Sequence, residues 1–295
     1  MILVAGSANL DFVVRTPHIP APGETVLGGE FRTYPGGKGA NQAVACARAG
    51  AADTSMLLAL GNDAFAGAIE QSLRRAGVRM LIVRAPEHAT GAAFITVADD
   101  AQNAIAVAPG ANYALQPADL PPLDGVTHLL LQLEIPLETL TAYARAARAR
   151  GVVVVLNAAP ARRLPPELLA ALDILVVNET ELAMLADIPQ DIERGLARLD
   201  LPCVVATLGA RGCVARINQQ LLRQAGFPVT AVDTTAAGDT FCGVLVAALS
   251  RGLAMPQALR QACAAAALAC TQAGAQSSIP SHAEVQAFLQ RQDSD

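Results

Sequence analysis

The sequence predicts an α/β fold built on a three-layer, doubly wound, mostly parallel sheet with helices on both faces. Two observations predict this class. Unbroken apolar runs that end in turn residues are typical of strands buried on both faces, and alanine-rich segments with helical spacing lie between those runs. Because strand and helix alternate, neighbouring strands are expected to run parallel, with ligands beyond their carboxyl ends.

Five apolar runs predict strands of this sheet. They are Ile2–Ala5, His128–Leu133, Val152–Leu156, Ile174–Val177 and Cys203–Thr207. Two helices are indicated most clearly, because apolar residues recur at helical spacing before a glycine, which commonly ends a helix. One carries Phe65, Ile69 and Leu73 before Gly77, and the other carries Leu137, Leu140 and Ala144 before Gly151.

Two stretches break the alternation and predict a second, smaller sheet. Phe12–Tyr34 holds three prolines and three glycines without a helical pattern, and Thr90–Pro109 alternates apolar and polar residues. Both favour short antiparallel strands. The domain hypothesis is an α/β core of residues 1–11, 36–89 and 110–295, and a β lid of residues 12–35 and 90–109. We expect the lid to cover the strand ends and to offer its outer face for dimerisation.

The composition excludes several classes of protein. Of 295 residues, 53% are hydrophobic and 16% charged, which excludes a disordered chain. An aromatic content of 3% and a net charge of −5 argue against a nucleic-acid surface. The apolar runs are far shorter than the roughly 20 residues of a membrane span, and the six cysteines form no C-x-x-C pair. We therefore expect a reduced, cytoplasmic protein without nucleic-acid or membrane partners.

A turn of small residues precedes the predicted helix Phe241–Leu249. Ala236, Ala237 and Gly238 let a ligand approach the backbone closely, and the first amides of a helix point outward at its positive end. These residues predict an anion hole. Asp239 could take a proton from a hydroxyl that attacks phosphorus, although capping of the helix by Asp239 explains the residue equally well.

A glycine turn surrounds the single lysine of the chain. Of the 21 lysine and arginine residues only Lys38 is a lysine, and it lies within Tyr34–Gln42, ahead of a predicted helix Ala43–Ala49. This is not a Walker A loop, because Gly39 rather than Ser or Thr follows the lysine. The turn brings backbone amides, an ammonium and a carboxamide to a helix start, which suits a polyhydroxylated ligand or a phosphate. The alternative is a flexible loop.

Polar side chains follow other predicted strands. Asn9 and Asp11 lie on one side beyond the first strand and could grip vicinal hydroxyls, although such residues are more often turn formers. Glu134 follows another strand. Asn178 fits a helix N-cap, with Glu181 completing a capping box. The functional interpretation places this pair near waters on a Mg²⁺ carried by nucleotide phosphates.

A further glycine turn, Thr207–Gly212, could lie under a nucleotide or form a hairpin turn.

Together these segments resemble the ribokinase family of sugar kinases, also called the PfkB family. The resemblance covers nearly the whole chain. The matching segments occur in the same order: Gly6–Asp11, Pro22–Thr25, Gly36–Asn41, Gly61–Asp63, Gly110–Asn112, Leu133–Glu134, Asn157–Pro160, Asn178–Glu181, Thr207–Gly212 and Asp233–Thr240.

The resemblance implies a ribokinase-like fold and transfer of the ATP γ-phosphoryl group to the 5-hydroxyl of ribose. It implies that Asp239 is the general base and that the amides of Ala236, Ala237 and Gly238 form the anion hole. The implied sugar site comprises Asn9, Leu10, Asp11, Gly37, Lys38, Gly39, Ala40, Asn41, Glu134 and Asp239. The implied ATP site comprises Asn178, Glu181, Thr207, Leu208, Gly209, Ala210, Arg211, Gly212, Gly238 and Cys263. An activating K⁺ would be held mostly by backbone carbonyls, at Asp233, Thr235, Ala269, Gln272, Gly274 and Ser278. Mg²⁺ and a homodimer through the lid are also implied.

Other functions stay open at this point. Another kinase of the family, acting on deoxyribose, another furanose or a nucleoside, would keep Asp239. A non-catalytic sugar-binding regulator would be expected to have lost Asp239, Gly238 or Asn178, and all three are present. A nicotinamide dehydrogenase is disfavoured, because the first strand leads into Gly6–Asn9 without a G-x-G-x-x-G motif. One departure from the family pattern is Val244, where a smaller residue is usual.

Overall fold

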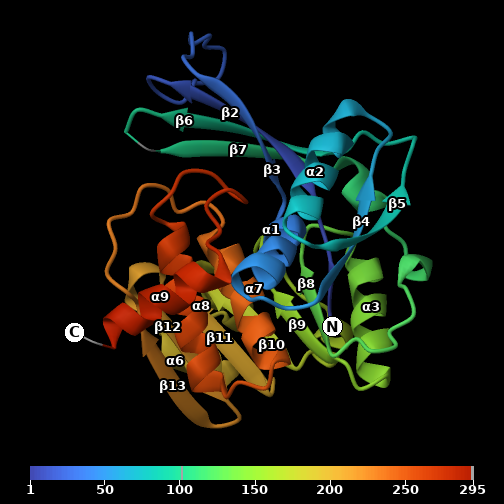
Figure 1. Ribbon diagram of the computed structural model, residues 1–295, viewed down its shortest axis with the longest axis vertical. Helices are drawn as coiled ribbons and strands as arrows, with labels where there is room; N and C mark the ends of the chain where they lie inside the picture. Colours follow the sequence, from blue (N-terminus) through green and yellow to red (C-terminus); the bar gives the residue numbers. More distant parts are fainter. Residues whose placement is uncertain (101, 294–295) are drawn as a thin grey trace.

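The computed structural model describes residues 1–100 and 102–293; Ala101, in the second stretch expected to form the small sheet, lies outside the described residues, as do Ser294 and Asp295. Within those ranges a large sheet of nine strands has the order β13-β12-β11-β10-β9-β8-β1-β4-β5 (Figure 1). Its strands are β1 (Ile2–Ala5), β4 (Thr54–Leu60), β5 (Arg79–Arg84), β8 (His128–Gln132), β9 (Val153–Asn157), β10 (Ile174–Asn178), β11 (Cys203–Thr207), β12 (Gly212–Ile217) and β13 (Gln220–Ala225).

The strands β5, β4, β1, β8, β9, β10 and β11 are neighbours in that order and pair in parallel. At the other edge of the sheet, β12 pairs antiparallel with β11 and with β13. The prediction of a mostly parallel sheet is therefore confirmed. Each of the five predicted strands is present to within one residue at either end. The turn Thr207–Gly212 joins β11 to its antiparallel neighbour β12, so it is a hairpin turn, as one interpretation of the sequence held.

Helices cover both faces of the large sheet (Figure 1). Ile2 and Val4 pack into one apolar cluster and Leu3 into the other, because successive side chains of β1 point to opposite faces. The first face is covered by α1 (Lys38–Val44), the π-helical turn η1 (Ala45–Ala49), α2 (Ala64–Arg75), α7 (Ala237–Ser250), α8 (Met255–Ala269) and α9 (His282–Gln292). The second is covered by α3 (Leu137–Ala149), α4 (Pro166–Leu169), α5 (Glu179–Ala186) and α6 (Ile192–Arg198). Short 3₁₀ turns are η2 (Gly110–Ala114), η3 (Pro117–Asp119) and η4 (Gly209–Arg211). Across the described ranges, no helix is long and apolar enough to cross a bilayer.

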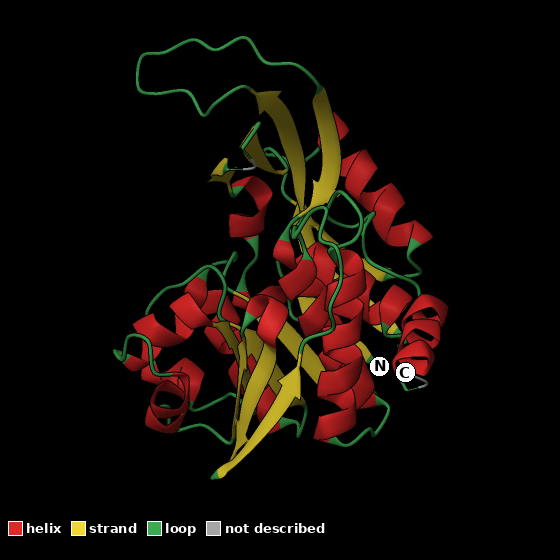
Figure 2. Ribbon diagram, turned by 90° about the vertical axis from the view of Figure 1, so that its left-hand side faces the viewer, coloured by secondary structure: helices red, strands yellow, loops and turns green. Residues whose placement is uncertain are grey.

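A small sheet projects beyond the helical layers (Figure 2). Its strands have the order β3 (Phe31–Gly36), β2 (Asn9–Thr16), β6 (Gly91–Ala98) and β7 (Asn103–Ala108). Strand β2 pairs antiparallel with β3 but parallel with β6, so the expectation of antiparallel strands alone is wrong. The reason is topological: β2 follows β1 and β6 follows β5, and both enter from the carboxyl ends of parallel core strands.

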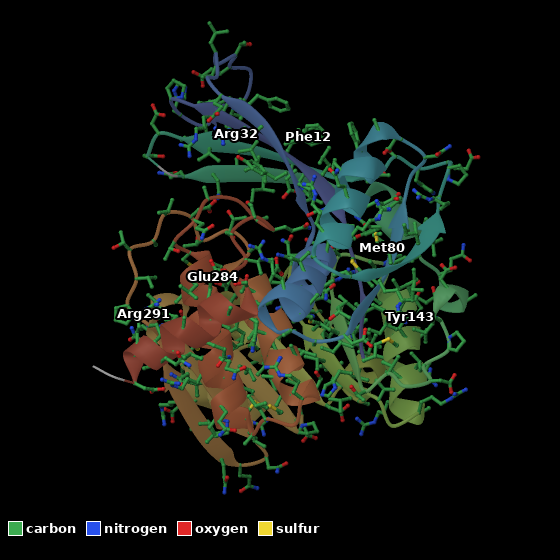
Figure 3. All side chains as sticks on the ribbon, viewed as in Figure 1. Phe12, Arg32, Met80, Tyr143, Glu284 and Arg291 are labelled. Atoms are coloured by element: carbon green, nitrogen blue, oxygen red, sulfur yellow. The ribbon has the colours of Figure 1, made fainter. Side chains whose placement is uncertain are left out.

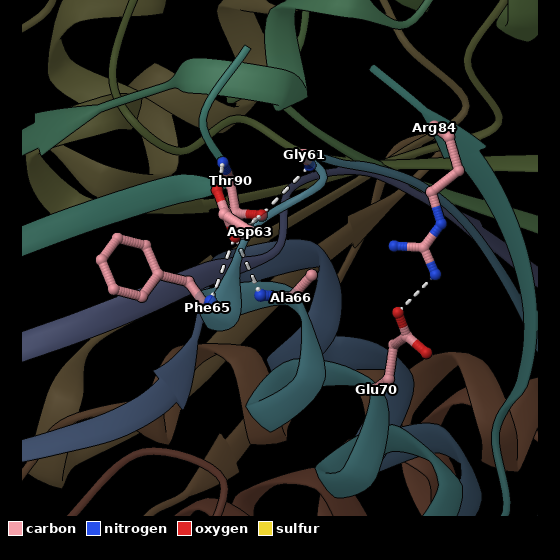
Figure 4. A network of polar contacts seen from close by, with 7 residues as sticks. All are labelled: Gly61, Asp63, Phe65, Ala66, Glu70, Arg84 and Thr90. Atoms are coloured by element: carbon pink, nitrogen blue, oxygen red, sulfur yellow. Dashed lines mark hydrogen bonds and ion pairs between the residues drawn. The ribbon is translucent and has the colours of Figure 1, made fainter. Parts of the chain in front are cut away.

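Asp63 joins the large sheet, α2 and the small sheet (Figure 4). Its carboxylate caps α2 by accepting from the N–H groups of Phe65 and Ala66. The same carboxylate accepts from Thr90, the residue before β6. The Thr90 hydroxyl in turn accepts from the N–H of Gly61 at 3.1 Å. One side chain therefore sets the position at which the small sheet leaves the core.

Helix α1 begins at Lys38, five residues earlier than the apolar pattern predicts. Its first turn lies directly against the end of β1. A Cβ added at Gly39 would lie 2.7 Å from the backbone of Gly6 and Ser7, so only glycine permits this approach. The apolar pattern marks the buried part of the helix and not its first turn.

Candidate active site

Asp239 lies in the first turn of α7, where two side-chain amides from α1 hold its carboxylate. Asn41 Nδ2 donates to Oδ2 at 2.9 Å, and Gln42 Nε2 donates to Oδ1 at 2.9 Å. The N-cap of α7 is Ala236, which makes no side-chain capping bond. The helix-capping explanation of Asp239 is therefore wrong. Asp239 is 8% exposed, so it is buried but not completely closed off from solvent.

The start of α7 faces open space. A Cβ added at Gly238 would meet no atom within 4 Å. The Ala237 N–H already donates to Thr234 O at 3.2 Å, whereas no described residue accepts from the N–H of Gly238. Ala236 has a φ of 59°, a left-handed conformation that costs an alanine about 1–2 kcal/mol. The chain thus holds a strained turn that exposes the positive end of a helix.

Lys38 is the cation at the centre of this region. Its side chain is half-buried. The negative charge of Asp239 raises the pKa of Lys38 above its ordinary value despite burial, and Glu134 and Glu181 add to the effect. Lys38 therefore stays protonated between carboxylates that come from α7, the end of β8 and α5.

The expected sugar ligands Asn9, Asp11 and Glu134 lie at the ends of the core strands beside this lysine. Asn9 Oδ1 accepts from Asn112 Nδ2 at 2.7 Å, and Asn9 is 3% exposed. Glu134 accepts from the Ser7 hydroxyl and from the Lys38 N–H. Leu10 does not join them, because side chains alternate along β2 and Leu10 points to the other face.

The electrostatics of Asp11 differ from those of an ordinary surface carboxyl. Its pKa is raised to about 7, chiefly by burial and further by the charges of Glu134 and Asp239, against the opposing charge of Lys38. A Cβ at Gly36 would lie 2.1 Å from Asp11 Oδ2, so the glycine provides the space that this carboxyl occupies. Asp11 therefore changes its charge near neutral pH.

Three amides of the glycine turn, those of Lys38, Gly39 and Ala40, already donate hydrogen bonds within the protein, whereas the sequence suggested that the turn offers its amides to a ligand. The Lys38 N–H donates to Glu134, the Gly39 N–H donates to Ser7 Oγ at 3.3 Å, and the Ala40 N–H donates to Ser7 O at 2.9 Å. The physical reason is the close approach of α1 to the end of β1. Gly37, with a φ of +86°, allows it, since a Cβ there would lie 2.8 Å from Ala8 Cα. In this turn, the Lys38 ammonium and the Asn41 side chain face the site.

On the far side of Lys38, Asn178 and Glu181 form the capping box that the sequence predicts. Asn178 Oδ1 accepts from the Glu181 N–H, and Glu181 Oε2 accepts from the Asn178 N–H, both at 2.8 Å. Burial raises the pKa of Glu181, while the Asn178 N–H and Lys38 lower it in part. Structural capping does not exclude the expected role toward phosphates, because Asn178 is exposed.

The expected nucleotide turn lies next to α5. Arg211, in η4, forms an ion pair with Glu179 at the start of that helix. Gly209 and Gly212 have positive φ values of 58° and 94°, which this tight turn requires. Cys263 is placed differently from the rest: it is buried in α8, with its thiol 3.7 Å from that of Cys213 in β12.

The positions expected to bind K⁺ lie in the loop before α7, at the end of α8 and in the loop after α8, and Asp233 joins the two loops. Asp233 Oδ2 accepts from the Gly274 N–H at 2.9 Å, and Oδ1 accepts from the N–H and hydroxyl of Thr235. Burial raises the pKa of Asp233, but these bonds outweigh it, so the pKa lies below its ordinary value. Gln272 belongs to the second loop, where its N–H donates to Ala269 O at 3.3 Å, and Ser278 is buried there.

Residues 1–282 match the family described as pfkB family carbohydrate kinase. The chain belongs to this family. A ribokinase of Haemophilus influenzae is 38% identical over 302 residues, covering 98% of each chain. The crystal structure of a ribokinase from Thermotoga maritima has a TM-score of 0.90 at 36% identity, covering 98% of this chain and 99% of that one. The Arabidopsis thaliana ribokinase complexed with ribose and ATP has a TM-score of 0.88 at 33% identity, covering 98% of each chain.

Four polar residues of this carbohydrate kinase escaped the sequence prediction. Asn112 contacts Asn9, and Gln42, Gln132 and Asn157 form a buried chain of amides behind Asp239. Asn112 and Asn157 lie in segments that carry the family resemblance, but no role could be assigned to them from spacing. One signal in the sequence pointed to Gln132, since it is a polar residue inside the apolar run of a predicted strand.

Proposed function

We propose that this pfkB-family kinase is an ATP-dependent ribokinase, which transfers the γ-phosphoryl group of ATP to the 5-hydroxyl of D-ribose. One observation carries the proposal: the Asp239 carboxylate is held by two amide donors at the open start of α7. Asn9, Asp11 and Glu134 lie nearby with acceptors suited to sugar hydroxyls. The likeness to ribokinases over nearly the whole chain supports ribose as the substrate.

Asp239 accepts the proton of the attacking hydroxyl. Asn41 and Gln42 each donate to one carboxylate oxygen, which leaves further lone pairs to receive that proton. The Lys38 ammonium and the amides at the start of α7 stabilise the negative charge on the transferring phosphoryl group. Asn9 and Asp11 orient the sugar so that its hydroxyl faces Asp239.

Asn178, Glu181 and the turn Thr207–Gly212 hold the nucleotide in this proposal, and Cys263 lies behind the base. In the described part of the chain, no three His, Cys, Asp or Glu side chains gather to bind a metal directly. Mg²⁺ therefore fits best as a partner of the phosphates, reached by Asn178 and Glu181 through water. When bound, Mg²⁺ neutralises phosphate charge.

A K⁺ bound between the loops of Asp233 and Gly274 would fix the turn that precedes α7. The fit rests on Asp233, whose carboxylate already joins both loops. Titrating KCl against NaCl at constant ionic strength tests it: K⁺ activates the parent enzyme, and Asp233→Asn raises the K⁺ concentration needed for half-activation. Equal activity in Na⁺ and K⁺ would remove K⁺ from the proposal.

The small sheet acts as a lid, defined as residues 12–35 and 90–109. One face of its sheet carries Phe12, which is labelled in Figure 3. The ring centroid of Phe12 lies 5.3 Å from that of Phe94, 6.2 Å from that of Phe31 and 5.2 Å from that of Phe65 in α2. Phe94 and Phe31 are 55% and 59% exposed. We propose that two lids pair through this face in a homodimer. Sedimentation should give twice the chain mass for the parent and for the control Met184→Asp, and the single mass for Phe94→Asp.

A coupled assay of ADP release tests the proposed activity. Ribose, deoxyribose, fructose and common nucleosides are compared with and without K⁺, and ribose should give the highest kcat/KM. Asp239→Asn should lose about 10²–10⁴-fold in kcat, as expected for removal of a general base. Undiminished ribose phosphorylation by that variant would show that Asp239 is not the base.

The same assay separates the alternatives. A different preferred furanose or nucleoside would keep the kinase assignment and change the sugar. Sugar binding without ADP release on any acceptor would indicate a regulator.

The proposed cytoplasmic location agrees with six cysteines that are all free.

A further inference from the structure

A chain of three buried side-chain amides lies behind the Asp239 carboxylate. Gln132 Nε2 donates to Gln42 Oε1 at 2.7 Å, and Gln42 Nε2 donates both to Asp239 Oδ1 at 2.9 Å and to Asn157 Oδ1 at 3.0 Å. Asn157 Nδ2 donates to Val176 O at 3.3 Å. Gln42 and Gln132 are completely buried. Neither can touch a sugar or a nucleotide.

The carboxylate fixes the direction of every amide in the chain. An ionised carboxylate only accepts hydrogen bonds, so the NH₂ group of Gln42 must face Asp239. The Gln42 carbonyl oxygen then points away and needs a donor, which Gln132 supplies. The second N–H of Gln42 needs an acceptor, which Asn157 supplies. Reversing any one amide would bring two donors or two acceptors together.

The positions of Gln132 and Asn157 follow from strand register. Gln132 on β8 pairs with Asn157 on β9, on the same face as Leu130 and Val155. Leu130 and Val155 are apolar neighbours of the pair on that face, and a buried amide costs about 1–3 kcal/mol unless it is hydrogen-bonded. Gly6 adjoins them, since its missing Cβ would lie 2.0 Å from Gln132 Oε1. The polar row thus occupies space that apolar side chains would ordinarily fill.

We infer that Gln42, aligned by Gln132 and Asn157, is a positioning residue that fixes the orientation of the Asp239 carboxylate for proton transfer. The inference rests on the proposed kinase activity. Asn41 approaches the other carboxylate oxygen from the ligand side, whereas Gln42 approaches from the core. With both bonds in place the carboxylate plane cannot rotate about its side-chain bond. Catalysis depends on such alignment at the level of about 1 Å.

The test uses Gln42→Met, which keeps the volume of the side chain and removes its hydrogen bonds. We expect kcat to fall about ten- to a hundredfold, while KM for ribose and for ATP and the calorimetric affinity for ribose stay within twofold. Thr139→Val is the matched control, because it removes a buried hydrogen bond from α3 to Leu115 on the opposite face of the sheet. It should lower Tm without changing kcat.

A second variant covers the case in which Gln42→Met does not fold. Gln132→Met leaves the bond between Gln42 and Asp239 and removes only the alignment of Gln42, so kcat should fall by a smaller factor. A third comparison identifies the route: Gln42→Met should have no further effect on kcat in the background of Asp239→Ala. Additive losses would mean that Gln42 acts without Asp239.

The outcomes distinguish this inference from the proposed function. A parent protein that phosphorylates no sugar would contradict the proposed function itself. An active parent, together with folded Gln42→Met and Gln132→Met variants of unchanged kcat, would overturn the positioning role alone. A rise in KM without a fall in kcat would overturn it as well, because it would place Gln42 in substrate binding.

Discussion

The Asp63 carboxylate accepts two hydrogen bonds from Thr90, one from the backbone N–H at 2.7 Å and one from the hydroxyl at 2.8 Å. Burial raises the pKa of Asp63, but the bonds from Thr90, Ala66 and Phe65 outweigh burial and hold the pKa below its ordinary value. In α2, the helix that Asp63 caps, Glu70 Oε1 forms an ion pair with the Arg84 guanidinium at 2.5 Å. The lid therefore leaves the core at an anchored point.

Asp63→Ala should lower Tm and raise the KM for the sugar severalfold, because it frees the start of β6. Asp191→Ala is the control: Asp191 also caps a helix, through the Arg194 N–H at 3.0 Å, but lies away from the lid. Both variants lose a cap worth about 1 kcal/mol, and only Asp63→Ala should change the KM. The pKa of Asp63 is lowered in the folded protein, so its carboxylate stabilises the fold at pH values above its ordinary pKa. The Tm difference from the parent should therefore shrink as the pH falls below about 4 and vanish once the carboxyl is protonated in the folded protein.

Asp11→Asn should stabilise the protein at alkaline pH and weaken sugar binding. The folded protein binds the Asp11 proton more tightly than the unfolded chain does, so this carboxyl costs stability as pH rises from about 4 to about 7. The Tm gain of Asp11→Asn should grow over that range and level off above it. In the parent, KM for ribose should fall as pH rises through 7, because the ionised Asp11 carboxylate accepts hydrogen bonds from the sugar hydroxyls. A flat Tm difference from pH 4 to 8 would contradict the raised pKa.

Lys38→Arg should raise the sugar KM or lower kcat about tenfold. A planar guanidinium is larger than an ammonium and differs in its donor geometry. The flanking glycines Gly37 and Gly39 pack closely against backbone, and the charges of Asp239, Glu134 and Glu181 act on the ammonium, so the site is fitted to a compact cation. The control Arg145→Lys, on an exposed position of α3, should leave both constants unchanged. If Lys38→Arg leaves both constants unchanged, the site does not require a lysine, and the single lysine reflects only the amino-acid composition.

Gly243→Ala should destabilise the protein by about 1–3 kcal/mol, as overpacking does. A Cβ there would lie 2.5 Å from Ala45 Cβ and 2.6 Å from Gln42 O. Gly67→Ala, in helix α2, is the control, since its Cβ would meet nothing within 4 Å. That change should be stabilising by up to about 1 kcal/mol. Thermal unfolding of the two variants measures the difference, and a neutral Gly243→Ala would mean that α7 can move away from α1.

The alternation of buried runs was sufficient to predict the large sheet, because strands such as β1 and β11 are apolar on both faces. The two stretches were expected to form one small sheet, but the parallel direction of β2 against β6 was not predictable in this way. Residues 12–35 and 90–109 are far apart in sequence, and hydrophobic alternation gives the face of a strand but not its direction or partner. The early starts of α1 and α7 were missed because their first turns contact backbone and ligand space instead of the core.

The candidate site was predicted where a residue type is itself informative, as with Asp239, Lys38 and the pair Asn178 and Glu181. The amides of Gln42 and Gln132 were not. Their contacts depend on register between strands and on the angle of α1, and neither quantity is encoded in local spacing. That Ser7 accepts from the amides of Gly39 and Ala40 was not foreseen for a related reason, since Ser7 lies in another part of the chain.

Strand β2 begins at Asn9 in the core and continues without interruption into the lid. Two proposed sugar contacts, Asn9 and Asp11, therefore lie on the same strand that continues into the lid. Because the lid begins at residue 12, directly after Asp11 in the same strand, a lid that is replaced or removed would change the strand that holds both proposed sugar contacts. In this chain, the proposed sugar contacts and the proposed lid are therefore coupled through one strand.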